Sequence, residues 1–501
     1  MKLLRYIRLT ICALLAFTVL SAALPADGAP RRKSARTTAV KRHKAKKKKS
    51  RRRRAKRPVL RWPLVTETNR DSILFPGYDK ADVGVIIRDL RTNADMVVQN
   101  PDKMLTPASI TKCATAAAAV LSGLETSRFT TLAKLQGVLS PDSVFVGSLI
   151  VEGSGDPSTE SHSFAEYAGL PDSIASKVNR LGIKYFYGSI EIDTLSLKEQ
   201  GPLSGWADED LPWTYGAGLY TLNFHDNCRY ADRADHNPGA TLRDAVRNKM
   251  MAGGVSFDTD SLMEMGIAVA TADGVKVFDK ELIYTHQSAP IGDLMRKMMT
   301  ESNNLYAEAM LRRLTPGRYR SDALKFEKIL FGRHGINISD CSVYDGSGLT
   351  RANLFSPRFM ADLLTEMSRD PKAEVYAGLF PKVGMEGTVK RLLKDTELEG
   401  QLILKSGSMR GVRCYAGYKL DGQGRPTHAV VIMINGFSCP QSALTKAIGE
   451  FLIRQFGQHP EAASITEEEE TTETVITDDS NEDSESETPD DEESEEEESQ
   501  N

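Results

Sequence analysis

The chain has 501 residues, of which 40% are hydrophobic and 26% are charged, and its formal net charge is −4 at pH 7. This length predicts two or three domains with a large core, and the ordinary composition excludes a chain that is disordered throughout. The near-neutral charge hides two segments of opposite sign: residues 31–57 carry 17 Lys and Arg and no acid, whereas residues 461–501 carry 20 acids and no base. Neither segment has enough apolar surface to fold, so we predict a basic disordered arm at 24–60 and an acidic disordered tail at 458–501.

The N-terminus has the pattern of an export signal. Lys2, Arg5 and Arg8 precede a long apolar run, and small residues stand before a cleavage point after Ala23. We therefore predict a signal peptide at residues 1–23 and an exported, periplasmic protein. The alternative is an uncleaved N-terminal membrane anchor in the opposite orientation, because positive charges that follow an apolar run oppose its translocation.

Residues 83–100 alternate apolar and polar residues on either side of a Thr-Asn turn, which predicts a β-hairpin. The following segment, residues 106–123, predicts one buried helix. Pro107 suits the first turn, the alanine run has a high helix propensity, and Gly123 suits the stop.

Ser109 and Lys112 lie three residues apart near the start of this helix, so their side chains share one face. A hydroxyl beside an amine is the arrangement of a nucleophile and its base, provided that burial or a second cation keeps the lysine partly unprotonated. A serine three residues before a lysine also arises by chance about twice in a chain of this length. The pattern alone leaves both interpretations open.

A long mixed region, residues 130–288, follows the helix. It contains strand-like runs at 143–151 and 183–192 and a turn-rich segment, GSGDPS, at 153–158. Because about 150 residues is the size of a domain, we predict an inserted region here. The alternative is that these strands continue the core sheet.

Residues 290–314 have an apolar stripe of helical period, which contains Ser302, Asn303 and Asn304. Three strands and a closing helix are predicted after it, at residues 401–409, 412–420, 427–435 and 441–456. Together with the hairpin, these elements predict an antiparallel sheet that is covered by helices and in which the two ends of the chain meet.

Five cysteines remain after the predicted signal peptide, and their odd number excludes complete pairing within one chain. No Cys-x-x-Cys spacing suggests a metal or redox site, and we expect no metal ion and no cofactor. We expect most of the five to be buried thiols: Cys113, Cys228, Cys341, Cys414 and Cys439.

Ser-x-x-Lys, Ser-x-Asn and Lys-Ser-Gly in this order are the three motifs of penicillin-binding proteins and serine β-lactamases. Each motif alone has a plain alternative: Ser302 and Asn304 as exposed polar residues of a helix, and Lys405 as a charge on an edge strand. Their order favours a shared site, because the first motif lies at a helix start and the third at a strand end.

The chain most resembles peptidase family S13, the low-molecular-mass D-alanyl-D-alanine carboxypeptidases/endopeptidases of the penicillin-binding protein 4 type. The segments that carry the resemblance are PASITK at 107–112, GSGDPS at 153–158, GWADEDLPWTYGAG at 205–218, SNN at 302–304, YDGSGLTR at 344–351 and KSGSM at 405–409. The resemblance covers residues 66–457 and leaves both charged segments outside.

The resemblance implies an α+β fold, with a β-lactamase/transpeptidase-like antiparallel sheet, flanking helices and a large inserted mainly-β region. We predict that residues 61–130 and 286–457 form a serine D,D-peptidase domain. Residues 131–285 are predicted to form one or more inserted domains, because the family has extra domains between its first two motifs.

The residue types predict a mechanism. Lys112, kept neutral by burial and by the charge of Lys405, takes the proton of Ser109 as the hydroxyl attacks the carbonyl between two D-alanines. Ser302 relays a proton to the departing amine. Asn304 holds the substrate amide with its paired donor and acceptor.

The resemblance places the developing oxyanion on the backbone N–H groups of Ser109 and Ser408. Lys405, together with the hydroxyls of Ser406 and Ser408, suits a substrate that ends in a free carboxylate, and Gly407 completes this motif. The family usually has threonines at the positions of Ser406 and Ser408. This departure affects rate and selectivity more than reaction class.

The family recognises the free D-centre of diaminopimelate, which carries an amine and a carboxylate. By resemblance, Asp156 binds the amine, Arg351 binds the carboxylate and Met409 lines the same pocket. The alternative is that Asp156 and Arg351 are turn residues, since Asp in a Gly-Asp-Pro turn often caps its own backbone.

We therefore predict a serine D,D-carboxypeptidase/D,D-endopeptidase that acts on peptidoglycan stem peptides or cross-links through an acyl-enzyme on Ser109 and is acylated by β-lactam antibiotics. The alternatives are a serine β-lactamase and a non-catalytic cell-wall binding protein. The basic arm has no Phe, Trp or Tyr to stack on bases, so we expect no nucleic-acid partner. We expect the arm to contact anionic envelope polymers or the acidic tail.

Overall fold

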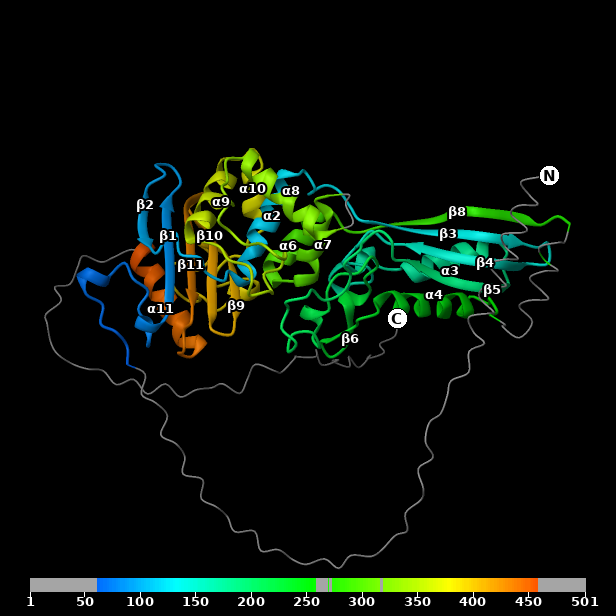
Figure 1. Ribbon diagram of the computed structural model, residues 1–501, viewed down its shortest axis with the longest axis horizontal. Coiled ribbons are helices and arrows are strands. Elements are labelled where there is room, and N and C mark those ends of the chain that lie inside the picture. The colour runs from blue at the N-terminus through cyan, green and yellow to red at the C-terminus, as the bar shows by residue number, and fades with distance from the viewer. Residues whose placement is uncertain (1–60, 258–268, 270–272, 316–318, 458–501) are drawn as a thin grey trace, which may run out of the picture.

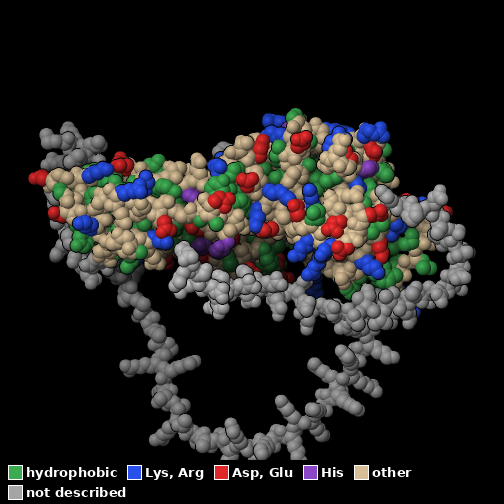
Figure 2. Space-filling view, turned by 180° about the vertical axis from the view of Figure 1, so that it is seen from behind, with side chains coloured by type: hydrophobic (Ala, Val, Ile, Leu, Met, Phe, Trp, Pro, Cys, Tyr) green, Lys and Arg blue, Asp and Glu red, His purple; other side chains and the backbone are tan. Residues whose placement is uncertain are grey.

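The structure, a computed structural model, describes residues 61–257, 269, 273–315 and 319–457. These residues form an elongated body of two lobes, each built around its own sheet (Figure 1). Lys and Arg side chains are interspersed with Asp and Glu over the face shown in Figure 2. The predicted signal peptide, basic arm and acidic tail lie outside the described residues.

The first lobe contains a five-stranded antiparallel sheet in the order β2-β1-β11-β10-β9. Its strands are β1 Asp82–Asp89, β2 Asp95–Gln99, β9 Leu402–Met409, β10 Val412–Leu420 and β11 Pro426–Asn435. The predicted hairpin and the three predicted C-terminal strands are confirmed. Strand β1 pairs with β11 along its whole length, with Asp82 opposite Asn435 and Asp89 opposite His428, so the two ends of the chain meet in the middle of one sheet.

Helices cover both faces of this sheet, because its strands are apolar on both sides. Val431 and Met433 of β11 belong to the core on one face, and Val430 and Ile432 belong to the core on the other. The first core is completed by α2 Thr111–Leu121, α6 Ile291–Glu301, α7 Asn304–Arg313, α8 Arg320–Arg333, α9 Pro357–Arg369 and α10 Ala373–Gly378. The second core is completed by residues 383–398 and by α11 Gln441–Phe456, which has the predicted bounds.

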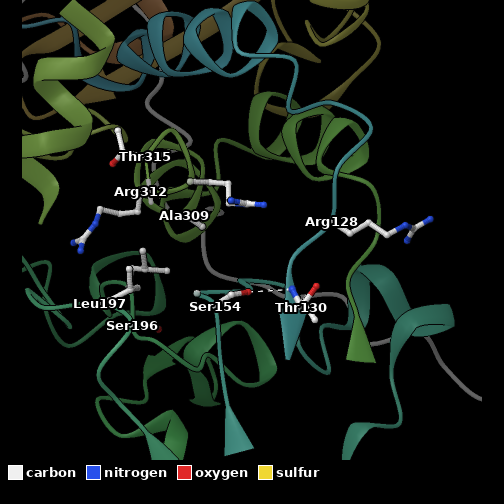
Figure 3. A pocket seen from close by; sticks show the side chains of 11 residues that line it. Arg128, Thr130, Ser154, Ser196, Leu197, Ala309, Arg312 and Thr315 are labelled. Atoms are coloured by element: carbon white, nitrogen blue, oxygen red, sulfur yellow. Dashed lines mark hydrogen bonds between the residues drawn. The ribbon is translucent and has the colours of Figure 1, made fainter. Parts of the chain in front are cut away.

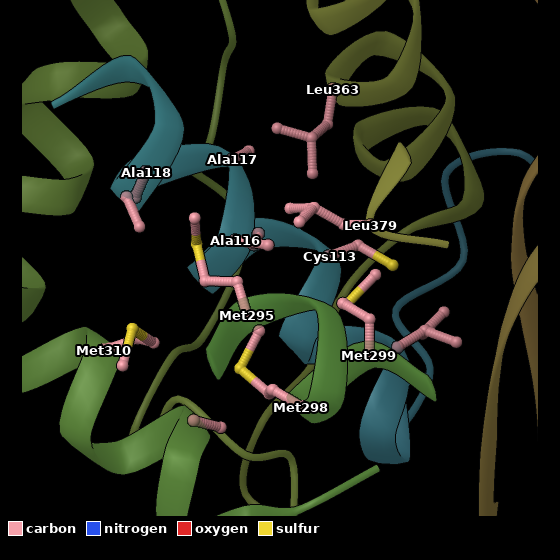
Figure 4. Packing of buried hydrophobic residues seen from close by; sticks show 14 of the residues in the cluster. Cys113, Ala116, Ala117, Ala118, Met295, Met298, Met299, Met310, Leu363 and Leu379 are labelled. Atoms are coloured by element: carbon pink, nitrogen blue, oxygen red, sulfur yellow. The ribbon is translucent and has the colours of Figure 1, made fainter. Parts of the chain in front are cut away.

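Helix α2 is the central helix of the first core. Its small side chains, such as Ala116, Ala117 and Ala118, leave room for neighbouring helices to approach closely, and Met295 and Met298 of α6 fill the space beside them (Figure 4). Every residue of α2 from Thr111 to Val120 is buried. The alanine run therefore fixes the helix by packing as well as by propensity.

The second lobe contains a four-stranded sheet in the order β5-β4-β3-β8. Its elements are β3 Thr130–Leu139, β4 Val144–Glu152, α3 Leu170–Arg180, β5 Tyr185–Asp193, α4 Pro238–Ala252 and β8 Lys276–Gln287, and a short pair, β6 Cys228–Tyr230 and β7 Arg233–Ala234, lies beside them. Strands β4 and β5 are parallel, with α3 between them in the chain, and α3 and α4 pack on one face of the sheet.

The chain enters this lobe through β3 and leaves it through β8, which are antiparallel neighbours. The strands of the lobe therefore do not continue the five-stranded sheet. This arrangement supports the proposed division into a peptidase domain at 61–130 and 286–457 and an insertion at 131–285.

In the part of the chain that the structure describes, no helix has both the length and the apolar character to cross a membrane. The five cysteines of these residues are all free, and Cys113, Cys414 and Cys439 are buried. Burial raises the pKa of the Cys113 thiol to about 12, which agrees with the prediction of a buried thiol and disfavours a reactive thiolate.

Candidate active site

Ser109 lies on a short 3₁₀ turn, Ala108–Ile110, that leads directly into α2. The Nζ atom of Lys112, in the first turn of α2, donates to the Ser109 Oγ atom at 3.0 Å. Lys112 is fully buried, and its amine also donates to the Asn304 side-chain oxygen at 2.7 Å and to the Ser347 carbonyl at 2.6 Å. The three acceptors fix the lysine nitrogen against the serine hydroxyl.

The predicted helical segment 290–314 is divided at Ser302 and Asn303, which separate α6 from α7. Ser302 has a left-handed backbone, with φ at 64°, and ends α6, while the side chain of Asn303 accepts from the Tyr306 N–H and caps α7. A positive φ is uncommon outside glycine and is often found at functional sites. This break turns Ser302 and Asn304 toward the two lysines instead of leaving them on a helix surface.

Lys405 lies on β9, an edge strand, but its side chain is fully buried and is not a solvated edge charge. Its Nζ atom donates to Ser302 Oγ at 2.9 Å and to the Ser406 carbonyl at 2.7 Å. The structure therefore brings the predicted residues together as two amine–hydroxyl pairs, Lys112 with Ser109 and Lys405 with Ser302.

The two amines have lowered pKa values, chiefly because they are buried. Burial lowers the pKa of Lys112 to about 7, although the carboxylates of Asp345 and Glu308 act in the opposite direction. Burial also lowers the pKa of Lys405 well below its ordinary value, and the positive charge of Lys112 adds to this shift. Burial and the Lys405 charge were both expected to keep Lys112 neutral. Burial is the main cause of its lowered pKa, whereas the repulsion between the amines lowers the pKa of Lys405.

Gly407 lies directly against the turn that carries Ser109. A Cβ atom at this position would lie 2.6 Å from the Pro107 carbonyl oxygen and 3.1 Å from the backbone N of Ser109. The absence of a side chain thus lets strand β9 run along the nucleophile's backbone, as the predicted oxyanion site at Ser109 and Ser408 requires.

Replacing Gly407 with alanine is expected to slow acylation by penicillin about 10²-fold, because the turn bearing Ser109 must move away from β9. Gly422→Ala is the matched control, since a Cβ there meets nothing within 4 Å. Stopped-flow measurement of acylation on both variants checks this. Equal rates for the two variants would show that β9 does not set the position of Ser109.

Two buried carboxylates, which the sequence did not single out, hold the loop that carries Ser347. Asp345 is fully buried and accepts from the N–H groups of Gly348 and Thr350, both at 2.8 Å. Glu308 of α7 accepts from the N–H groups of Gly346 and Ser347 at 3.1 and 2.9 Å. Because the Ser347 carbonyl accepts from Lys112, both acids position that lysine. Asp345 lies in the YDGSGLTR segment, which could have indicated its role. No sequence pattern indicated Glu308, which lies four residues after Asn304.

The remaining residues of the third motif lie at the open edge of the site. The Ser406 and Thr388 hydroxyls are 2.7 Å apart, and the exposed Ser408 hydroxyl accepts from the Gln441 side chain at 3.3 Å. Arg351 is exposed and donates to the carbonyl of Arg410, in the turn that follows Met409. Arg351 and Met409 therefore lie near the end of β9.

Asp156 is buried in a turn of the second lobe. Its Oδ1 atom accepts from the N–H of Ser158 at 2.8 Å and from the Ser158 hydroxyl at 2.7 Å, and burial raises the pKa of the carboxyl. The Oδ1 atom thus caps its own turn, as the alternative for Asp156 expected, whereas the buried Oδ2 atom has no hydrogen-bond partner among the described residues. In the described part of the chain, Asp156 forms no hydrogen bond to Ser109, Lys112 or Arg351.

A cavity of about 340 Å³ is lined by Ser302 and Asn304, together with Trp213 and Tyr215. The Tyr215 carbonyl accepts from the Asn304 amide at 3.0 Å, so the GWADEDLPWTYGAG segment forms one wall of the site. A second cavity of about 240 Å³, between α7 and the second lobe, contains none of the predicted site residues, and Arg128 at its rim points away from it (Figure 3). Among the described residues, no cluster of His, Cys, Asp and Glu suits a metal ion.

A serine hydroxyl bonded to a buried lysine, with a second lysine–serine pair at the end of an antiparallel sheet, defines a serine acyl-transfer site of the class found in penicillin-binding proteins and β-lactamases. The model of the D-Ala-D-Ala carboxypeptidase 3 (S13) family matches residues 70–258 and 245–453. The chain belongs to this family, and it is accordingly a serine-type D-Ala-D-Ala carboxypeptidase of the penicillin-binding kind.

Known proteins with similar sequences and structures agree with this placement. The chain is 25% identical to D-alanyl-D-alanine carboxypeptidase DacB of Haemophilus influenzae over 422 residues, which cover 72% of this chain and 86% of that protein. It is 24% identical to a D-alanyl-D-alanine carboxypeptidase of an Actinomadura species over 471 residues, which cover 78% and 85% of the two chains. The crystal structure of penicillin binding protein 4 from Haemophilus influenzae matches with a TM-score of 0.65 and 20% identity over 79% of this chain and all of that one, which confirms the predicted α+β fold.

Proposed function

We propose that this carboxypeptidase cleaves the peptide bond that follows a D-alanine carbonyl in peptidoglycan, through an acyl-enzyme on Ser109. It removes the terminal D-alanine from stem peptides or opens the cross-links between them. The observation that carries the proposal is the pair of contacts between Lys112 and Ser109 and between Lys405 and Ser302. A neutral amine bonded to the nucleophile and a second hydroxyl beside it provide both proton transfers that peptide cleavage needs.

Acylation begins when the neutral amine of Lys112 takes the Ser109 proton and the Oγ atom bonds to the carbonyl carbon between two D-alanines. The negative charge on the carbonyl oxygen is stabilised by the backbone N–H groups of Ser109 and Ser408. The C–N bond then breaks, and the proton reaches the departing amine through Ser302, which Lys405 orients. Asn304 holds the substrate amide beside this path.

Water completes the cycle by attacking the ester carbonyl, which returns the proton to Ser109 and releases the shortened peptide. The leaving group is D-alanine in the carboxypeptidase reaction and the amine of a second stem peptide in the endopeptidase reaction. A terminal carboxylate is favoured by Lys405 and by the hydroxyls of Ser406 and Ser408 at the end of β9. A β-lactam mimics the same carbonyl and acylates Ser109; a structure of Haemophilus influenzae penicillin binding protein 4 is described as complexed with a novel β-lactam.

Recognition of diaminopimelate is the finer part of the proposal. Arg351 and Met409 lie at the edge of β9, where a substrate side chain leaves the site, and Arg351 is exposed and available to a carboxylate. Asp156 is the proposed partner of the amine. Burial raises the pKa of its carboxyl, and a cationic partner offsets the cost of keeping the carboxylate ionised. The proposal also includes export to the periplasm, which rests on the N-terminal pattern.

The decisive experiment is mass spectrometry of the penicillin adduct, followed by digestion of muropeptides cross-linked through meso-diaminopimelate. We expect the adduct on the peptide that contains Ser109, an acyl-enzyme that lasts longer than minutes, and release of D-alanine or of uncrosslinked muropeptides. The Ser109→Ala variant is the control and should give neither adduct nor products.

Two results would support the alternative functions. Release of hydrolysed penicillin within minutes would indicate a β-lactamase. Complete lack of labelling by fluorescent penicillin, in folded protein, would indicate a cell-wall binding protein without turnover.

A further inference from the structure

A basic groove with a volume of about 780 Å³ runs between α11 and residues 387–396, on the side of the sheet opposite α2. The cations that line it come from three elements: Lys390, Arg391, Lys394, Arg413 and Lys446. Glu450 is the one acid of the lining. This imbalance differs from the mixed charges on the face shown in Figure 2.

The three lysines of this basic groove have little compensation from neighbouring acids. Lys446 lies 3.8 Å from Glu450 in an exposed i,i+4 pair, which contributes little. Within the residues that the structure describes, no ion pair joins Lys390 or Lys394 to a carboxylate, and both side chains are exposed. Glu399 lies on the other side of these two lysines, in a neighbouring hollow. The groove therefore keeps a positive potential and attracts anions.

The two ends of the basic groove meet two different parts of the molecule. At the inner end, Thr388 contacts the Ser406 hydroxyl and Gln441 contacts the Ser408 hydroxyl, so the groove reaches the catalytic strand β9. At the outer end, Ile453 lies three residues before the end of α11. The chain continues from there into the acidic segment at residues 461–501.

We propose that the basic groove binds the acidic C-terminal segment of this chain, residues 461–501. The segment carries 20 acids and no base, which complements a lining of five cations and one acid. The proposal concerns a surface outside the catalytic residues and stands independently of the reaction that they perform.

The length and attachment of the segment make this contact easy to form. Helix α11 has 16 residues and spans about 24 Å. The ten residue steps from Gly457 to Glu467 reach up to about 33 Å, so the run of glutamates at 467–470 can return along the whole helix to the inner end of the groove. Attachment to the same chain gives the segment an effective concentration of roughly millimolar, so weak charge pairing suffices.

The basic arm at residues 31–57 is the competing partner for the acidic segment. The Lys446 amine lies 5.4 Å from the centroid of the Trp62 ring, and Trp62 follows the basic arm in the sequence by only a few residues. The groove differs from the arm because its cations are held on a strand, a helix and a packed segment. Binding of the acidic segment to the groove therefore orders fewer side chains and less backbone than binding to the arm.

The test uses the full-length protein and zero-length cross-linking of carboxylates to amines at low protein concentration, followed by mass spectrometry. We expect cross-links from residues 461–501 to Lys390, Lys394 and Lys446. We also expect cleavage of the segment by a glutamate-specific protease to be about fivefold faster in the triple variant Lys390→Glu/Lys394→Glu/Lys446→Glu, and about fivefold faster in the unmodified protein at roughly 0.5 M salt, where charges are screened beyond about 4 Å.

The matched control carries the same charge change on the opposite side of the sheet: Lys325→Glu, Lys328→Glu and Arg333→Glu, all exposed on α8. This variant should be cleaved like the unmodified protein, and thermal unfolding checks that both variants are folded. Cross-links to the basic arm alone, with equal cleavage of the two triple variants, would overturn the proposal in favour of arm binding. Cross-links only between molecules would also overturn it.

Discussion

Replacing Lys112 with alanine is expected to lower the rate of Ser109 acylation by penicillin about 10³-fold, the range typical for removal of a general base. The lysine amine is the atom that contacts the Ser109 hydroxyl, at 3.0 Å, and no other amine in the described residues is bonded to it. Stopped-flow acylation kinetics measure the effect. Lys328→Ala on α8 removes an exposed lysine and should leave the rate unchanged.

The same lysine sets the expected pH dependence. Only the neutral amine can accept the proton, and burial lowers the pKa of Lys112 to about 7. Acylation should therefore be slow at low pH, rise as pH increases through about 7 and level off above it. The residual rate of Lys112→Ala should lack this rise. A rate that falls as pH increases through 7 in the unmodified protein would contradict the assignment of Lys112 as the base.

Replacing Asp345 with alanine is expected to lower the free energy of unfolding by about 3–5 kcal/mol, because several buried donors lose their acceptor together. The carboxylate is fully buried and accepts from two backbone N–H groups, from the Trp206 indole at 3.0 Å and from the Asn353 amide at 2.7 Å. Chemical denaturation of the two proteins measures the difference.

The Asp345 substitution should also impair acylation at temperatures where the variant is folded, since the loop that it holds presents the Ser347 carbonyl to Lys112. Asp340→Ala is the control, because Asp340 is exposed and lies close in the chain, and it should change the unfolding free energy by less than about 0.5 kcal/mol. A similar loss for both variants would mean that the Asp345 hydrogen bonds do not stabilise the loop.

Local patterns in the sequence predicted much of the fold. The hairpin, strand β10 and helix α11 were predicted with their observed bounds or within a few residues, because alternation, turn residues and helical period are encoded within each segment. The break at Ser302 was not predicted, since the apolar stripe of α6 and α7 continues across it. The parallel pairing of β4 with β5 also depends on contacts between segments that no local pattern records.

The candidate site was also predicted only in part from the sequence. Motif order compensated for the weakness of each motif, so the sequence predicted five site residues that the structure brings into contact: Ser109, Lys112, Ser302, Asn304 and Lys405. Glu308 escaped notice because a carboxylate on a helix is usually exposed, and its burial depends on the Gly346–Gly348 backbone folding onto it. Asp156 shows the converse: its motif matches, but only one of its carboxylate oxygens caps a turn, and its role toward the substrate stays a prediction.

The pairing of β1 with β11 has a consequence for how the protein matures. The middle strand of the main sheet, β11, is made only after some 425 residues, so the nascent chain cannot close that sheet until a late stage of synthesis. The second lobe, with its own sheet and core, is complete much earlier. A product that terminates before residue 426 therefore lacks the strand that joins β1 to β10, and we expect it to be inactive.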